Sequence, residues 1–333
     1  MNTATIPALE PARSQAASSV SIKHLPVNLF GSVMGLAGLG LAWRLAHQYF
    51  GVSPLIGEAI ALFAGLVFVV VGAGYLTKLV RHRQAVVNEF KHPIAGNFFG
   101  TIVIALLLLS VVAAPYSEGF AQVLWSVASL LAVALGGLVL SRLLKGKQDL
   151  QHAVPAWLIP GVATLDITVT GAHMPMAWAG ELNLLATAVG AALALVFFTS
   201  IFPRLVHQDA LAKGMVPSLM ILVAPFEVGF LAYTNLFGEV DRFAGMLFYF
   251  GLFLAVVLSF KVFRRDVPFA PSWWAISFPL AALSNAAFKY AHAQGGVALQ
   301  GLAWVILVLL TIVLAVLTVK TLASLFRGQL LSA

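Results

Sequence analysis

The sequence predicts an all-α membrane protein with ten transmembrane helices. Hydrophobic residues make up 61% of the 333 residues, and charged residues make up only 9%. The mean hydropathy is +0.97. A soluble domain of this length carries far more charge on its surface, so the composition assigns most of the chain to a lipid bilayer.

Each predicted helix is an apolar run of roughly 20 residues, the length that spans the hydrocarbon core of a bilayer. The runs lie at residues 26–47, 55–79, 94–114, 119–144, 154–173, 180–202, 214–236, 240–262, 271–292 and 297–324. Together they form one transmembrane domain, residues 25–325. Residues 1–24 are rich in Ala, Ser and Pro and predict a disordered cytoplasmic tail. Residues 326–333 predict a second short cytoplasmic tail.

The distribution of Lys and Arg predicts the orientation of these helices. With the N-terminus inside the cell, sixteen of the 19 Lys and Arg residues fall on the cytoplasmic side, and only Arg44, Arg242 and Lys289 lie at outer ends. By the positive-inside rule both termini are therefore cytoplasmic. The same rule accounts for the net charge of +7 without a nucleic-acid partner.

The odd-numbered runs differ from the even-numbered runs in their prolines. Each odd run begins at or near a proline, and these are Pro26, Pro93, Pro155, Pro217 and Pro271, spaced 54 to 67 residues apart. This spacing predicts five copies of one helical hairpin. Only odd runs contain an interior proline, at Pro160, Pro225 and Pro279. Proline inside a helix removes a backbone hydrogen bond and bends the helix.

Bent backbone at membrane depth is tolerated where protein or a water-filled cavity surrounds it. We therefore expect the odd helices to form an inner ring around a central pore, while the even helices face lipid. Gly35 in the first run and Gly100 in the third are assigned with the prolines to pore lining or to bends. The alternative is that the prolines only shape the packing between helices.

Phe278 stands directly before Pro279 in the stretch "SWWAISFP". Because a proline distorts its local turn, the adjacent ring could lie on the axis and close the pore; the alternative is ordinary core packing. If Phe278 faces the pore, Asn285 and Lys289 lie within about 20° of the same helix face. Lys289 then attracts anions to the outer mouth, or it is an interfacial lysine whose ammonium reaches water.

Two acidic residues lie inside predicted helices, Asp166 in the fifth run and Glu227 in the seventh. An unpaired carboxylate at membrane depth costs free energy, so each needs a partner or a function. As proton carriers they would suit a coupled transporter. As salt-bridge partners of Arg44, Arg242 or Lys289 they would suit a channel, and we favour the salt bridges.

The sequence predicts no metal site, no cofactor and no enzyme. Cysteine is absent, which excludes disulfides and thiolate ligands. The histidines most suggestive of a metal site lie at loops or helix ends without ligand spacing, at His47, His82, His92 and His207. The chain also lacks a phosphate-binding loop and a nucleophile elbow.

Four stretches, in order along the odd runs, carry a resemblance to a known family. They read "EFKHPIAGNFFG", "PAWLIPGV", "PSLMILVAPFEVGFLAY" and "SWWAISFPLAAL". They resemble the tellurite-resistance and dicarboxylate transporter family, which includes TehA-like proteins and slow-type anion channels. The resemblance covers residues 24–325. It implies five helical hairpins in a quasi-fivefold array, a homotrimer with one pore in each protomer, and a phenylalanine plug at the position of Phe278.

Two transport functions follow from these observations. The first is a passive channel for small anions in a bacterial inner membrane, with Phe278 as its gate. The second, which the resemblance also implies, is a proton-coupled carrier of malate-like four-carbon dicarboxylates or sulfite. A membrane protein without transport activity is a third possibility, and five odd helices packed without an axial cavity would favour it.

Overall fold

The computed structural model describes residues 20–146 and 149–332, and these residues form α-helices and short 3-10 helices without any β-strand. Eight of the helical segments are long and apolar enough to cross a membrane. The fifth and ninth predicted runs are also helical, at residues 155–171 and 271–294. The fifth is shorter than the other segments, and the ninth contains more polar residues.

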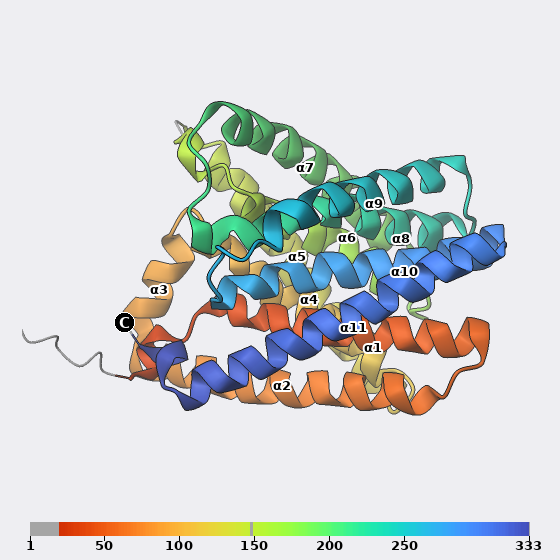
Figure 1. The fold of residues 1–333 in the computed structure, drawn as a ribbon, viewed down its shortest axis with the longest axis horizontal. Coiled ribbons are helices and arrows are strands. Elements are labelled where there is room, and N and C mark those ends of the chain that lie inside the picture. The colour runs from red at the N-terminus through yellow and green to blue at the C-terminus, as the bar shows by residue number, and fades with distance from the viewer. Residues whose placement is uncertain (1–19, 147–148, 333) are drawn as a thin grey trace, which may run out of the picture.

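The α-helices, with the bounds used below, are α1 (Gly31–Phe50), α2 (Pro54–Arg81), α3 (Arg83–Lys91), α4 (Gly100–Ala113), α5 (Glu118–Leu143), α6 (Ile159–Gly171), α7 (Ala179–His207), α8 (Ala224–Phe237), α9 (Arg242–Val262), α10 (Ser277–Gln294) and α11 (Val297–Phe326). All except α3 run roughly along one direction, and α3 crosses them at one end (Figure 1). The 3-10 helices are η1 (Ile22–His24), η2 (Val27–Phe30), η3 (Ala95–Phe99), η4 (Leu150–His152), η5 (Pro155–Leu158), η6 (Lys213–Val223), η7 (Pro271–Ile276) and η8 (Gln329–Leu331).

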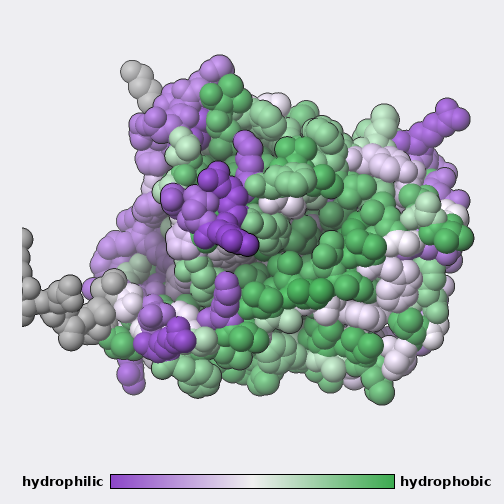
Figure 2. All heavy atoms as spheres, in the orientation of Figure 1, coloured by the Kyte–Doolittle hydropathy of each residue, from purple (hydrophilic) through white to green (hydrophobic). Residues whose placement is uncertain are grey.

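Burial separates the long helices into two sets, as the alternation along the sequence predicts. The segments that contain α1, α4 and α8 are 67–78% buried over their most apolar windows, whereas α2, α5, α7, α9 and α11 are 22–39% buried. Nearly all residues of α6 and most residues of α10 are also buried. We call α1, α4, α6, α8 and α10 the inner helices and the other five the outer helices. On the face seen in Figure 2, a broad apolar band lies between two more hydrophilic ends.

Every inner helix begins as a 3-10 helix and then changes to an α-helix. The pairs are η2 with α1, η3 with α4, η5 with α6, η6 with α8, and η7 with α10. Pro160 and Pro225 are the second residues of α6 and α8, and Pro279 is the third residue of α10. The first turn of an α-helix has backbone N–H groups without an intrahelical acceptor, so a proline there loses no helical hydrogen bond.

Two expectations about the prolines are therefore corrected. The interior prolines do not interrupt one continuous α-helix, because they mark the change from 3-10 to α geometry. Interior prolines are also not confined to the odd runs. Outer helix α7 continues to His207, beyond the predicted end at residue 202, and so contains Pro203.

Glycines allow the inner helices to approach one another closely. A Cβ atom at Gly35 would overlap the side chain of Ser277, and one at Gly38 would lie 2.7 Å from the Cβ of Ala281, so α1 and α10 pack tightly. A Cβ atom at Gly100 would lie 2.7 Å from Cγ2 of Ile159, between α4 and the start of α6. Gly35 and Gly100 thus set the spacing between inner helices.

The two described chain ends meet at the same end of the molecule. The predicted N-terminal tail lies outside the described residues up to residue 19, but Ile22–His24 form η1. The backbone N–H of Ser21 donates a 3.0 Å hydrogen bond to the carbonyl of Leu331, in η8. The predicted C-terminal tail therefore contains a short helical turn that contacts the beginning of the described chain.

Helix α3 is attached to the start of the first inner segment through Glu89. The carboxylate of Glu89 accepts hydrogen bonds from the backbone N–H of Val27 (2.8 Å) and the hydroxyl of Tyr75 (2.9 Å), and it pairs with Lys78 (2.6 Å). Lys78 also donates to the carbonyl of Leu25 at 2.7 Å. This network connects α2, α3 and η2 at the end of the molecule where the inner segments begin.

Candidate functional site

Three cavities lie in series between the inner helices. The first, which we call the N-terminal cavity, has a volume of 270 Å³ and lies among the 3-10 segments. The narrow cavity has a volume of only 30 Å³ and shares Asn28 and Phe98 with the first. The C-terminal cavity has a volume of 490 Å³ and shares Phe278 with the narrow cavity. Residues from all five inner segments line each of the three cavities.

Each inner segment presents one face to these cavities. In and directly after the fifth segment the lining residues are Ala156, Ile159, Val162, Asp166, Val169, Thr170, Ala172 and His173. In the seventh segment they include Ile221, Ala224, Val228, Leu231 and Asn235. Spacings of three or four residues place side chains on one face of a helix. The cavities therefore follow the length of the inner helices.

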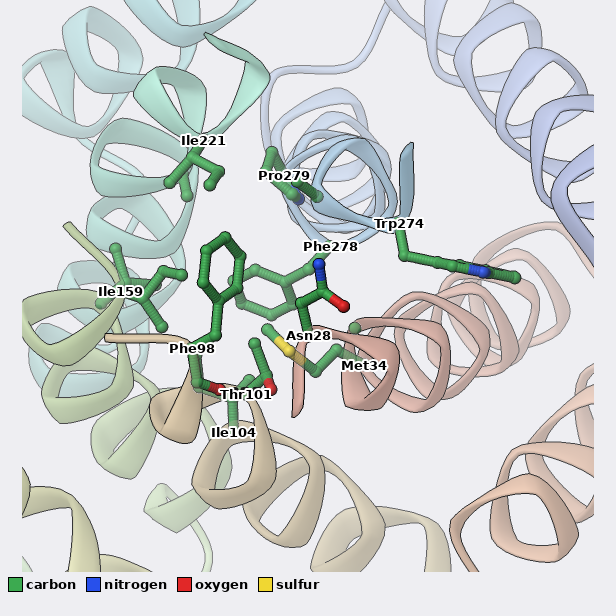
Figure 3. A pocket seen from close by; sticks show the side chains of 14 residues that line it. Asn28, Met34, Phe98, Thr101, Ile104, Ile159, Ile221, Trp274, Phe278 and Pro279 are labelled. Atoms are coloured by element: carbon green, nitrogen blue, oxygen red, sulfur yellow. Dashed lines mark hydrogen bonds between the residues drawn. The ribbon is translucent and has the colours of Figure 1, made fainter. Parts of the chain in front are cut away.

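The narrow cavity contains two phenylalanine rings. Phe278 of α10 and Phe98 of η3 point toward the centre of the inner helices, near Ile159, Ile221 and Met34 (Figure 3). A volume of 30 Å³ holds about one or two water molecules. Most of the side chains around this space are apolar, and Asn28 and Thr101 are its polar side chains. Two polar side chains cannot replace the hydration shell of an ion. The two rings separate the larger cavities.

Phe278, the candidate gate, lines both the narrow cavity and the C-terminal cavity, and the residue is only 6% exposed. Pro279 also lines the narrow cavity, whereas Pro160, Pro225, Gly35 and Gly100 line none of the three. The sequence interpretation missed Phe98. The sequence feature that could have identified Phe98 is the pair of phenylalanines between two glycines in "GNFFG", at the start of the third run.

Lys289 lines the C-terminal cavity and is half-buried. Its ammonium donates a 2.5 Å hydrogen bond to Oδ1 of Asn235 in α8. The amide of Asn235 in turn donates to the carbonyl of Val169 in α6 at 2.8 Å. The cation is therefore held in place by two neighbouring inner helices, and no carboxylate pairs with it among the described residues.

Arg44, the second cation of the C-terminal cavity, is neutralised by Glu58. The guanidinium makes two 2.8 Å hydrogen bonds to the two carboxylate oxygens. It also donates to the carbonyls of Val111 and Val112 at 3.2 Å, near the end of α4. Tyr116 donates a hydrogen bond to the same carboxylate of Glu58. These contacts connect α1, α2 and α4.

Asn285 lies in the wall of the C-terminal cavity, on the side of α10 that faces α1. Its amide nitrogen donates to the carbonyl of Gly38 (3.0 Å) and to that of Ala281 (2.8 Å). Phe278, Asn285 and Lys289 all line this cavity.

Asp166 and Glu227 are both buried, and neither forms an ion pair among the described residues. The expected salt bridges with Arg44, Arg242 or Lys289 are therefore absent from the structure. Asp166 lines the C-terminal cavity. Glu227 lines none of the three cavities, because its carboxyl is turned away from the axis and lies against Gly251 of outer helix α9.

Among the described residues no group of three or more His, Asp or Glu side chains could hold a metal ion. The polar groups around the axis include both cations and the carboxyl group of Asp166. Donors in the C-terminal cavity include the ammonium of Lys289 and the guanidinium of Arg44.

Comparison with known proteins assigns the chain to a family. Residues 24–322 match the family described as voltage-dependent anion channel. The guard cell S-type anion channel SLAC1 of Arabidopsis thaliana is 28% identical over 323 residues, which cover 92% of this chain and 57% of the plant protein. The tellurite resistance protein TehA homolog of Haemophilus influenzae is 27% identical over 316 residues, 92% of each chain.

The similarity extends to archaea. The uncharacterized transporter MJ0762 of Methanocaldococcus jannaschii is 24% identical over 283 residues, 78% of this chain and 82% of that protein. The chain spans about half the length of the plant channels it matches, with 57% of SLAC1 and 54% of SLAH2 covered. Since the family match extends over most of its length, the chain belongs to the voltage-dependent anion channel family.

Proposed function

We propose that this protein is a passive channel for small anions, and that the anions pass through the three cavities along the inner helices. The ten predicted runs then cross the membrane as five hairpins in a quasi-fivefold array, each with one inner and one outer helix. The observation that supports this most directly is that all five inner segments line every one of the three cavities. At family level the function is anion transport across a membrane.

In this proposal Phe278 is the gate, and Phe98 completes the closed constriction. An anion that enters the narrow cavity must lose most of its water, and the two rings offer no polar replacement. The pathway is therefore closed in this state. Conduction requires the ring of Phe278 to leave the axis.

The positive-inside rule supports an orientation with the N-terminal cavity facing the cytoplasm. The C-terminal cavity, with Lys289, then faces the outside of a bacterial inner membrane. A membrane potential contributes about 2.3 kcal/mol per charge for each 100 mV. With the inside negative, an open channel mainly releases anions, so a closed resting state protects the cell from anion loss.

Selectivity among anions is expected to be weak. The cavities lack a ring of basic side chains, and Lys289 is the cation without an acidic partner among the described cavity-lining residues. A single cation raises the local anion concentration but does not replace a complete hydration shell. Small monovalent anions, which lose water at the lowest cost, are the expected substrates. The homotrimer implied by the family resemblance stays a prediction.

Replacement of Phe278 tests the proposal. In planar bilayers or oocytes we expect Phe278→Ala to raise the anion current at least tenfold over the wild type, because it removes the ring between the two larger cavities. Phe248→Ala is the matched control, since Phe248 is also buried but lies in α9 and lines none of the three cavities. An unchanged current in a correctly folded Phe278→Ala protein, or an equal increase in the control, contradicts the gate.

The second candidate is a proton-coupled carrier of malate-like dicarboxylates or sulfite. The presence of Asp166 in the wall of the C-terminal cavity favours it, because a carboxyl group there can bind a proton. A carrier predicts saturable uptake that depends on the proton gradient and fails in Asp166→Asn. Current that rises linearly with voltage and persists without a proton gradient excludes the carrier.

A further inference from the structure

Asp166 is the acidic side chain in the wall of the C-terminal cavity that has no ion-pair partner among the described residues. It lies on the cavity-facing side of α6, four residues before Thr170 and seven before His173. Its side chain is 1% exposed, and its Oδ2 atom has no hydrogen-bond partner among the described residues. No ion pair within the described chain therefore neutralises this carboxyl group when it is ionised.

The charged and titratable groups that share the cavity come from several helices. Helix α1 contributes Arg44, which is paired with Glu58 of α2, and Tyr49; α10 contributes Lys289; His173 follows α6 itself. Helices α4 and α8 contribute no acidic or basic side chain to this cavity. The outer helices packed on α6 present Trp125, Asn183 and Thr187 to it, and none of these titrates near neutral pH.

We propose that Asp166 links proton binding to anion binding in the C-terminal cavity. When protonated, its carboxyl adds no charge and donates a hydrogen bond to an anion. When ionised, it repels the anion. This inference rests on the proposed anion pathway and adds a residue that controls its occupancy.

The expected size of the effect follows from Coulomb's law. Two like charges roughly 10 Å apart, at an effective dielectric constant of about 20, repel each other enough to lower occupancy on the order of tenfold. Linkage is reciprocal, so an anion in the cavity must favour the protonated form of Asp166 by the same factor. Acid conditions therefore tighten anion binding.

Glu227 provides a matched control for this inference. It is as fully buried as Asp166 and likewise has no partner among the described residues, but it faces Gly251 of α9 and lines no cavity. Loss of its charge is expected to leave the link between pH and anion binding intact. His173→Gln removes the imidazole that lines the same cavity.

The experiment measures nitrate binding to the purified full chain by thermal shift at pH 5.5 and pH 7.5. We expect nitrate to bind about tenfold more tightly at pH 5.5 in the wild type, Glu227→Gln and His173→Gln proteins. In Asp166→Asn the two affinities should agree within about twofold, because Asn is neutral at both pH values. The same tenfold pH dependence in Asp166→Asn, or its loss in His173→Gln, overturns the proposal.

A current measurement separates this inference from the proposed channel. In the Phe278→Ala background, we expect acidification on the side of the C-terminal cavity to raise the anion current several-fold, and Asp166→Asn to give a high current at both pH values. If Phe278→Ala carries no anion current, the proposed channel function is refuted. The role of Asp166 is then still decided by the nitrate-binding measurement. If the currents of Phe278→Ala and Phe278→Ala/Asp166→Asn respond equally to pH, the link between protonation of Asp166 and anion binding is refuted, while the channel function is not.

Discussion

The ammonium of Lys289 in α10 donates a 2.5 Å hydrogen bond to Oδ1 of Asn235 in α8, so a cation is fixed at the wall of the C-terminal cavity. Sequence alone left two roles for this lysine, attraction of anions or a surface position with its ammonium in water. The contact with Asn235, together with the place of both residues in the cavity wall, favours the first role.

Loss of this cation is expected to lower the anion current at low salt. In the Phe278→Ala background, Lys289→Met should reduce single-channel conductance several-fold at about 0.1 M salt. The conductances of Phe278→Ala and Phe278→Ala/Lys289→Met should become nearly equal at about 1 M salt. At that concentration the Debye length falls to roughly 3 Å, so the charge of Lys289 is screened. The matched control is Lys320→Met, since Lys320 lies over the ring of Phe269, outside the three cavities. Equal losses at both salt concentrations would contradict an electrostatic role.

The second ring of the constriction should limit the size of the anions that pass. Phe278→Ala leaves Phe98 in the narrow cavity. We expect the double variant Phe98→Ala/Phe278→Ala to conduct a bulky anion such as gluconate, which the single variant excludes. Reversal potentials in mixed chloride and gluconate solutions measure this ratio. If both variants exclude gluconate equally, Phe98 does not contribute to the constriction.

Close packing between α1 and α10 makes Gly35 intolerant of a side chain. A Cβ atom there overlaps Ser277, whose hydroxyl is already held by the carbonyl of Gly31 at 2.9 Å. Gly35→Ala should therefore lower the unfolding free energy by about 1–3 kcal/mol. Gly65→Ala is the matched control, because Gly65 lies in α2 with open space around its Cβ position. Thermal unfolding in detergent compares the two, and equal stability would rule out the tight contact.

The start of α9 should lose stability in acid. Asp241 caps this helix, and the backbone N–H of Ala244 and the hydroxyl of Tyr233 both donate to its carboxylate, which lowers the pKa of Asp241. Because the pKa of Asp241 is lower in the folded protein, its carboxylate contributes fully to folding stability above the unfolded pKa of about 3.9. This contribution is lost as pH falls through the pKa of the folded protein. The melting temperature of Asp241→Ala should therefore be lower than that of the wild type at pH 7, and the difference between the two melting temperatures should narrow below pH 4. A difference in melting temperature that stays constant from pH 7 to pH 3 would contradict a stabilising role of the Asp241 carboxylate.

The separation into inner and outer helices could be predicted because it depends on composition. Outer helices expose large apolar side chains to lipid, whereas the inner segments begin at prolines and carry glycines at their contacts. The face shared by Phe278, Asn285 and Lys289 was also predictable, since it requires only a regular helix after Pro279. These features are local, and each can be read from one stretch of sequence.

The features that the sequence did not reveal depend on contacts between distant segments. Gly35 packs against Ser277 from the other end of the chain, and nothing near Gly35 in the sequence distinguishes packing from pore lining. Asp166 and Glu227 looked alike as isolated acids, but only Asp166 lines a cavity. Phe98 was missed because a phenylalanine pair is common in apolar sequence. Its position in the narrow cavity depends on η3, whose 3-10 geometry no residue pattern had indicated.

The change from 3-10 to α geometry also determines how far an inner segment reaches. A 3-10 helix rises about 2.0 Å per residue and an α-helix about 1.5 Å. The four residues of η5 and the 13 residues of α6 together extend roughly 27 Å, close to the ~30 Å thickness of the hydrocarbon core. A stretch that is too short to cross a bilayer by residue count thus nearly matches its thickness through tighter winding of its first turn.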